Sequence, residues 1–499
     1  MGVLTGLEPE KVFYYFEEIT KIPHGSGNVE AISDYLVDFA KSRGLFWVRD
    51  KWMNVIIVKE ATYGYENEPA VMLQGHMDMV AVSQPGYHID MTKEGLKIAV
   101  DGDNIYACGT SLGGDDGIAV AYMLALLDSD SLQHPRLEVV ITVDEEVGMD
   151  GAKNINLSML QAKRLINLDS EDEGIFLTSC AGGARVNCSL KARMEERKGV
   201  FCGITIGGLL GGHSGTEIHR GRGNSNCIFA RVLRRLTEEF PVQLVELKGG
   251  RADNAIPRDT RAILLLPLQE DTEKGRQRLI LDARKVDRAL AEVRDEITQE
   301  LEHRDPNFLL KWSMNSNSVM KAKAVLAEDT RKIAQILLAL PNGVQSMSTE
   351  IPDLVETSLN FGILNFKEER IHAAFSIRSS LDVAKYALID RLKAIMELAG
   401  GDCTVAGDYP GWKYRANSPL RDKMIAVYED MYGERPEVEG IHAGLECGLL
   451  AGKIPDLDCV SMGPQMYDVH TTEETLSISS TARVWEYLVK LLATKEIYS

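Results

Sequence analysis

The segment Val71-Met-Leu-Gln-Gly-His76-Met-Asp78 joins a short apolar run to a histidine and a carboxylate. Three further apolar runs of strand length are residues 54–58, 137–143 and 164–168. Runs of Val, Ile and Leu are typical of strands buried in a helix-covered sheet. Residues 118–127 are apolar nearly all round, so we expect a buried helix between two of these strands. This strand–helix–strand order predicts an α/β layer fold.

The N-terminal part adds two expected helices, over residues 9–19 and 29–39, with Asn28 capping the second. After residue 410, we expect a helix over 420–432 and a strand over 457–462, which resemble the helix and strand pattern of the first third of the chain. The simplest arrangement is one α/β domain, residues 1–185 and 410–499, with a central helix-flanked sheet.

The middle of the chain, residues 186–409, is predicted to be an inserted α+β lid domain. Its pattern suggests internal duplication, because two strand–helix–strand–strand units follow each other. The expected strands are 199–206, 242–247, 262–266, 309–314, 354–366, 370–378 and 403–408, and the expected helices are 226–236, 286–301, 329–340 and 383–398.

Composition narrows the class of protein. The chain has 499 residues, 55 Lys and Arg, 74 Asp and Glu, and a formal net charge of −19. This acidic balance argues against nucleic acid or an anionic membrane as a main partner. The eight cysteines form no Cys-x-x-Cys pair, which favours reduced thiols in the cytoplasm. No apolar run reaches the ~18 residues of a membrane-spanning helix.

Metal-type ligands follow the predicted strands at five places. Side chains two apart on an extended chain point the same way, so His76 can bind a metal while Asp78 orients its imidazole. The other four places are Asp115-Asp116 in a glycine-flanked turn, Asp144-Glu145-Glu146, Asp169 with Glu171, and Asp468 with His470 and Glu473.

Each of these places has an ordinary interpretation when taken alone. A single histidine at a strand end is usually a structural residue, and acidic turns are usually solvated loops or helix caps. The glycine-rich stretches lack the spacing of phosphate-binding loops, and no His-Glu-x-x-His motif is present. Ligands in open α/β sheets, however, collect at the carboxyl ends of strands. Burying so many acids without a cation would be costly, so the conjunction indicates two divalent metal ions.

The motifs GHMDMV, SLGGDDGIA, DEEVG, LDSE and VHTTEE together resemble the co-catalytic zinc aminoacylase and carboxypeptidase family. The similarity is greatest to its aminoacyl-histidine dipeptidase branch. It extends over the whole chain through GGHSG, RADNAIP, FSIRSS and HAGLECG.

The resemblance implies roles for single residues. His76 and Asp169 would bind one zinc ion, Glu146 and His470 the other, and Asp115 would bridge both. An exchange of roles between Asp115 and Asp116 stays open. The remaining implied roles are Asp78 behind His76, Glu145 as general base and acid, His213 as oxyanion-stabilising lid histidine, and Asn254 and Arg378 as substrate-binding residues.

The resulting hypothesis is a cytoplasmic metallo-dipeptidase that cleaves Xaa-His and other dipeptides with a zinc-activated water. Co²⁺ or Mn²⁺ could replace Zn²⁺, since such sites discriminate weakly among these ions. One alternative is another amide hydrolase, a deacylase or tripeptide aminopeptidase, and a second is a non-catalytic metal-binding regulator. The intact Glu145 argues against the regulator. The expected partner is a small peptide substrate. Two points stay open: whether the protein forms a homodimer, and whether His213 acts in cis or in trans.

Overall fold

The computed structural model describes residues 2–495, and its chain divides into two compact units. The first unit comprises Met1–Cys180, Trp412–Gly440 and Leu445–Ser499, and the second comprises Ala181–Gly411 with Ile441–Gly444. No helix between residues 2 and 495 combines the length and apolar character needed to cross a membrane.

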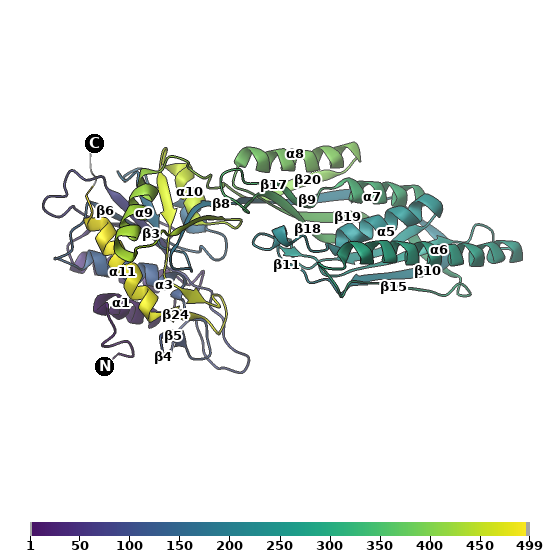
Figure 1. Ribbon diagram of the computed structural model, residues 1–499. Coiled ribbons are helices and arrows are strands. Elements are labelled where there is room, and N and C mark those ends of the chain that lie inside the picture. Colours follow the sequence, from purple (N-terminus) through teal and green to yellow (C-terminus); the bar gives the residue numbers. More distant parts are fainter. Residues whose placement is uncertain (1, 496–499) are drawn as a thin grey trace. The chain divides into compact units, whose positions relative to one another are not determined.

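The first unit is a mixed α/β structure (Figure 1). Its helices are α1 (Glu10–Thr20), α2 (Glu30–Ser42), α3 (Gly114–Leu127), α4 (Asp150–Asn154), α9 (Pro419–Tyr432), α10 (Glu446–Lys453) and α11 (Ile478–Ala493). Its strands are β1 (Phe46–Arg49), β2 (Val55–Lys59), β3 (Val71–His76), β4 (Ile98–Asp101), β5 (Asn104–Ala107), β6 (Leu137–Thr142), β7 (Arg164–Asn167), β8 (Ile175–Cys180), β21 (Glu437–Ile441), β22 (Asp458–Ser461), β23 (Met466–Tyr467) and β24 (Thr475–Ser477).

The main sheet of the first unit has the strand order β1-β2-β6-β3-β7-β22-β8-β21. Its four central strands, β6, β3, β7 and β22, are parallel to one another. The last residues of these strands are Thr142, His76, Asn167 and Ser461. Parallel strands end at the same edge of a sheet, so the loops that follow them meet there.

Helix α3 lies at the centre of this unit. Every one of its residues is buried, and it packs on β3 while α1 packs on it in turn. A helix that is apolar on all sides needs neighbours on all sides, which explains why its sequence has so little amphipathic character. The start of α3 therefore has a fixed position beside the end of β3.

The second unit is built on a separate ten-stranded antiparallel sheet (Figure 1). Helices α5 (Ser225–Glu239), α6 (Glu273–Leu301), α7 (Ala327–Ala339) and α8 (Asp382–Leu398) pack against it. The strands are β9 (Gly182–Lys191), β10 (Met194–Gly207), β12 (Gln243–Gly249), β14 (Thr260–Pro267), β15 (Leu309–Met314), β16 (Met320–Val325), β17 (Gly343–Met347), β18 (Val355–Lys367), β19 (Arg370–Ser379) and β20 (Asp402–Tyr409). A two-stranded antiparallel sheet of β11 (Gly212–His213) and β13 (Ala255–Ile256) and a 3₁₀ turn (Ile218–Arg220) complete it.

The predicted fold class is confirmed: a helix-flanked α/β sheet accompanies a large, mainly antiparallel α+β unit. Internal duplication of the second unit stays a prediction. The expected cap was wrong, because α2 begins after Val29, and the Asn28 amide instead donates a hydrogen bond to the carbonyl of Thr92.

Strand β9 was missed by the sequence analysis. It starts with Gly182-Gly183, which reads as a loop, yet it pairs with both β19 and β20. A Cβ atom at Gly183 would lie 2.7 Å from the ring of Tyr409. The glycine therefore allows a close approach between strands and does not mark a turn.

We expect Leu124→Ala to lower the free energy of unfolding of the metal-free protein by about 2–5 kcal/mol, because it opens a cavity in the packed interior around α3. Leu124 is 0% exposed, whereas Leu281 on α6 is 56% exposed and serves as the matched control. Urea denaturation of both variants measures the difference. Equal stability of Leu124→Ala and Leu281→Ala would contradict the packing described for α3.

Candidate metal centre

The strand ends of the first unit bring together the metal-type ligands that are far apart in sequence. His76 ends β3, Asp169 follows β7 by two residues, and Glu146 lies in the turn after β6. Asp115 lies at the start of α3, and His470 lies in the loop between β23 and β24.

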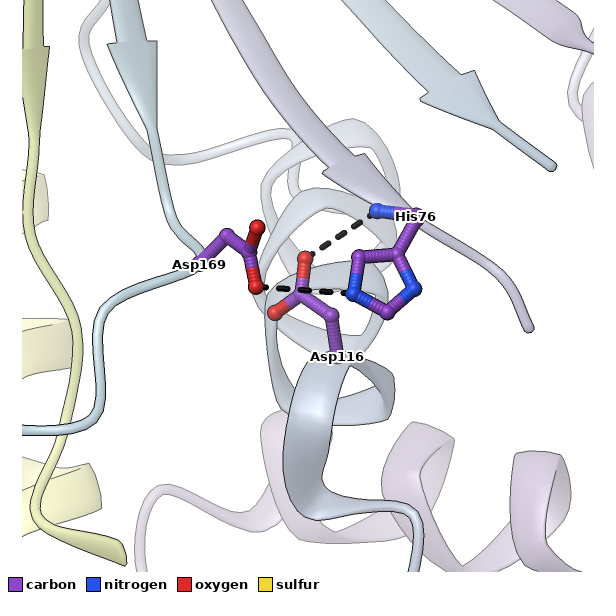
Figure 2. A group of neighbouring side chains, drawn as sticks. All are labelled: His76, Asp116 and Asp169. Atoms are coloured by element: carbon purple, nitrogen blue, oxygen red, sulfur yellow. Dashed lines mark hydrogen bonds and ion pairs between the residues drawn. The ribbon is translucent and has the colours of Figure 1, made fainter. Parts of the chain in front are cut away.

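The first group of ligands surrounds His76. Its Nε2 atom lies 3.0 Å from Asp115 Oδ1 and 3.4 Å from Asp169 Oδ1. Figure 2 shows the imidazole at the end of β3 facing Asp169, with Asp116 beside it. On the other side of the ring, His76 Nδ1 is 3.0 Å from the carbonyl oxygen of Asp78 and 3.5 Å from its Oδ1. Donation from Nδ1 leaves Nε2 free to bind a metal ion.

The second group surrounds His470, which lies on the other oxygen of the same carboxylate. His470 Nε2 is 3.0 Å from Asp115 Oδ2 and 2.9 Å from Glu146 Oε1. Asp115 thus directs one oxygen to each histidine. This is the arrangement that a carboxylate shared between two metal ions requires.

Three sets of potential ligand atoms in residues 2–495 lie within 4.8 Å of one another. They are His76–Asp116–Asp169, His76–Glu145–Glu146 and Asp115–Glu146–His470. Histidine nitrogen and carboxylate oxygen are ligands that suit Zn²⁺ and related divalent ions.

Asp115 and Asp116 have different surroundings although they are adjacent. Asp116 is 0% exposed, and its Oδ2 accepts a hydrogen bond of 3.1 Å from the backbone N–H of His76. Its Oδ1 has no hydrogen-bond partner among the described residues. Asp116 therefore accepts a hydrogen bond from the backbone of His76, whereas the two oxygens of Asp115 each lie 3.0 Å from a histidine side chain.

The acids of this site carry more negative charge than the two histidines balance. Burial, reinforced by the negative charge of Asp115, raises the pKa of Asp169 to about 7. Burial and the charges of Asp115 and Asp169 likewise raise the pKa of Glu171 to about 7. Hydrogen bonds to Asp115 and Glu146 raise the pKa of His470 to about 11. Divalent cations would supply the missing positive charge, so the residues present fit two such ions.

Asp78 connects His76 to the turn that carries Glu145. Its Oδ1 accepts a hydrogen bond of 3.2 Å from the Glu145 N–H, and its Oδ2 accepts one of 2.8 Å from the Ser26 hydroxyl. Burial, with the nearby charges of Asp169 and Glu446, raises the pKa of Glu145 well above its usual value. A carboxyl group with a raised pKa is suited to taking and returning a proton.

Glu474 is a supporting residue that the sequence analysis missed. Its Oε2 accepts hydrogen bonds from the Leu112 N–H (2.8 Å) and the Gly113 N–H (3.2 Å), and its Oε1 accepts one from the Gly114 N–H (2.8 Å). An acid at a helix N-terminus satisfies N–H groups that have no partner within the helix. The only sequence signal was its position beside His470 in VHTTEE.

The second unit brings together three other predicted residues. The Arg378 guanidinium on β19 lies 3.5 Å from His213 Nε2 at the end of β11. The carbonyl of Asn254 accepts a hydrogen bond of 2.9 Å from the Ser214 N–H, which places Asn254 beside His213. Burial and the positive charge of Arg378 lower the pKa of His213, so its imidazole is neutral at neutral pH.

The fold and this ligand set define a metallopeptidase, and comparison with known families agrees. The signature of peptidase family M20/M25/M40 matches residues 72–494, and the chain belongs to this family.

Relatives narrow the comparison further. The chain is 37% identical over 505 residues to the cytosol non-specific dipeptidase of Escherichia coli K12, covering 100% of this chain and 99% of that protein. It is 34% identical to an aminoacylhistidine dipeptidase from Vibrio alginolyticus, whose crystal structure matches with a TM-score of 0.89 over 100% of this chain and 99% of that one. An aminopeptidase from Bacillus cereus, at 16% identity, 98% coverage of both chains and a TM-score of 0.52, shares the fold. These matches confirm the resemblance seen in the motifs.

We expect Gly75→Ala to weaken metal binding, because the added Cβ would overlap Asp116 Oδ2 and lie 2.9 Å from Ala119 Cβ. Overpacking of this kind costs about 1–3 kcal/mol and would displace the neighbouring His76. Bound metal after dialysis against graded chelator measures the effect. The control is Gly207→Ala, whose Cβ would meet only Leu309 Cδ1 at 3.5 Å. Wild-type metal retention by Gly75→Ala would show that the site tolerates the displacement.

Proposed function

We propose that the protein is a metal-dependent dipeptidase that hydrolyses Xaa-His and other dipeptides with two divalent metal ions, zinc in the first instance. The family is one of peptidases, and the two full-length relatives carry dipeptidase names. The word cytosol in the name of the Escherichia coli relative supports a cytoplasmic location. A homodimer stays a prediction.

The observation that carries this proposal is the position of Asp115 between two histidines. Its two oxygens each lie 3.0 Å from an imidazole, and Asp169 and Glu146 lie on the two sides. His76, Asp115 and Asp169 would hold one ion, and Asp115, Glu146 and His470 the other. When bound, the ions would supply the positive charge that polarises the scissile carbonyl.

Glu145 is the general base in this proposal. Its carboxyl group takes a proton from the attacking water and returns it to the leaving amine. Asp78 supports this role from behind, because it binds both the Glu145 N–H and the His76 imidazole. A non-catalytic metal-binding protein would have no use for such a base beside a ligand.

Substrate recognition falls to residues of the second unit. Arg378 would bind the free carboxylate of the dipeptide, since a guanidinium matches a carboxylate with two parallel hydrogen bonds. His213, held neutral beside Arg378, would donate a hydrogen bond to the oxyanion of the tetrahedral intermediate. Asn254, whose carbonyl accepts a hydrogen bond from the Ser214 N–H next to His213, would bind the substrate backbone.

Chelation should abolish hydrolysis of a dipeptide such as Ala-His, and Zn²⁺, Co²⁺ or Mn²⁺ should restore it.

Glu145→Ala should keep its metal but lower kcat by at least ~10²-fold, whereas Glu146→Ala should lose metal. Metal content and kcat measured on the same samples test both statements. Full activity without metal would refute the proposal. If Glu145→Ala loses metal and Glu146→Ala keeps it, then Glu146 is the base and Glu145 is the ligand. Cleavage of acyl-amino acids or tripeptides in preference to dipeptides would favour the alternative hydrolases.

Arg378→Ala should raise KM for dipeptides, and dipeptide amides should be poor substrates of the wild-type protein because they lack the carboxylate.

His213→Ala should keep both metals and lose about 10²–10³-fold in kcat. Steady-state kinetics on matched dipeptides and amides make the comparison. Equal turnover of the two substrates would remove Arg378 from carboxylate recognition, and an unchanged kcat in His213→Ala would make that histidine structural.

A further inference from the structure

A chain of buried polar side chains crosses the main sheet directly behind the metal ligands. It starts at Glu446, the first residue of α10, whose Oε2 accepts hydrogen bonds from Gln74 Nε2 (2.5 Å) and from the Thr142 hydroxyl. Gln74 Oε1 in turn accepts a hydrogen bond of 2.7 Å from Asn167 Nδ2. The Ser461 hydroxyl donates to Asn167 Oδ1, and so the buried polar chain reaches β22.

Three members of this chain lie close in sequence to a proposed ligand or to the base. Gln74 precedes His76 by two residues on β3, and Asn167 precedes Asp169 by two residues. Thr142 ends β6, immediately before the turn that carries Glu145. Glu446, Gln74, Thr142, Asn167 and Ser461 are all 0% exposed. The chain therefore links the ends of three ligand-bearing strands without reaching solvent.

The burial of the Glu446 carboxyl group at this position is energetically unfavourable. Its Oε1 has no hydrogen-bond partner among the described residues, and burial raises its pKa to about 8, so that the carboxyl group is mostly protonated at neutral pH. Well-packed apolar residues are often at least as stable as buried ionisable groups. This energetic cost indicates that Glu446 serves a purpose other than the stability of the fold.

Glu138 provides a comparison on the same sheet. It is also 0% exposed, but it lies near the opposite end of β6. Its carboxylate is paired with Arg136 at 2.9 Å and accepts hydrogen bonds from the backbone N–H groups of Gln161 and Ala162. Glu138 is thus a satisfied structural carboxylate. Within residues 2–495, by contrast, one oxygen of Glu446 has no partner, and the other accepts hydrogen bonds from the side chains of Gln74 and Thr142.

We propose that Glu446 is a positioning residue of the metal centre, which holds the carboxyl ends of β3, β6 and β7 at the spacing that His76, Glu146 and Asp169 need to bind metal. The inference rests on the proposed function, because it takes these residues as ligands. Residues that orient ligands typically change metal affinity by 10–100-fold when removed.

The experiment compares Glu446→Ala and Glu446→Gln with Glu138→Ala and Glu138→Gln. Metal-free samples are titrated with Zn²⁺ in competition with a chromogenic chelator, and their thermal unfolding is recorded without metal. The values of kcat and KM for a dipeptide are then measured on the reloaded proteins.

We expect Glu446→Ala to weaken Zn²⁺ binding by about 10–100-fold and to lower kcat, with little change in KM. Glu446→Gln should recover most of the lost affinity, because its amide oxygen still accepts the hydrogen bonds of Gln74 and Thr142. Glu138→Ala should lower Tm without changing the affinity for Zn²⁺.

Wild-type Zn²⁺ affinity in Glu446→Ala, or losses of affinity in the Glu446 and Glu138 variants that follow their losses of Tm, would overturn the inference. If Glu446→Ala does not fold, Thr142→Val carries the test, since it removes a donor to Glu446 at nearly constant shape, and unchanged affinity there would overturn it as well. Absence of Zn²⁺ binding by the wild-type protein would refute the proposed function itself, an outcome distinct from failure of the Glu446 variants alone.

Discussion

The concentration of negative charge at one edge of a parallel sheet is the constraint on which the first unit depends. Parallel strands end together, and here His76 ends β3, while Glu146 and Asp169 follow β6 and β7. Burial raises the pKa of Asp169 and of Glu171, and the neighbouring negative charges raise it further. Only cations, or protons taken up in their absence, balance such a group, and the pairing of Asp115 with both His76 and His470 prepares the site for two of them.

A second layer of hydrogen bonds keeps these ligands in place. Asp78 fixes the imidazole of His76, Glu474 fixes the backbone before Asp115, and Asp116 fixes the backbone of His76. Glycine at position 75 leaves room for the Asp116 carboxylate. Such contacts lower the entropic cost of assembling a metal site, because the ligands are already oriented before the ion arrives.

The sequence predicted those parts of the fold whose signal is local. Apolar runs located β2, β3, β6, β7 and β22, and the all-round apolar character of residues 118–127 located α3. Strand β9 escaped because its first residues, Gly182 and Gly183, resemble a loop, although neighbouring strands pass close to both of them. The cap of α2 was wrong because Asn28 has a partner, the carbonyl of Thr92, that lies far away in sequence.

The sequence by itself determined the kinds of ligand, their order along the chain and the family to which they point, because those follow from residue types at fixed short spacings. Tertiary structure alone decided the different surroundings of Asp115 and Asp116. It also decided which residues, distant in sequence from the ligands, form hydrogen bonds that support the metal centre. Glu446 reaches Gln74 across 372 residues, and Glu474 reaches Leu112 across 362. Hydrogen bonds of this range leave no periodicity in a sequence, since they depend on strand order and helix packing that arise only when the chain is folded.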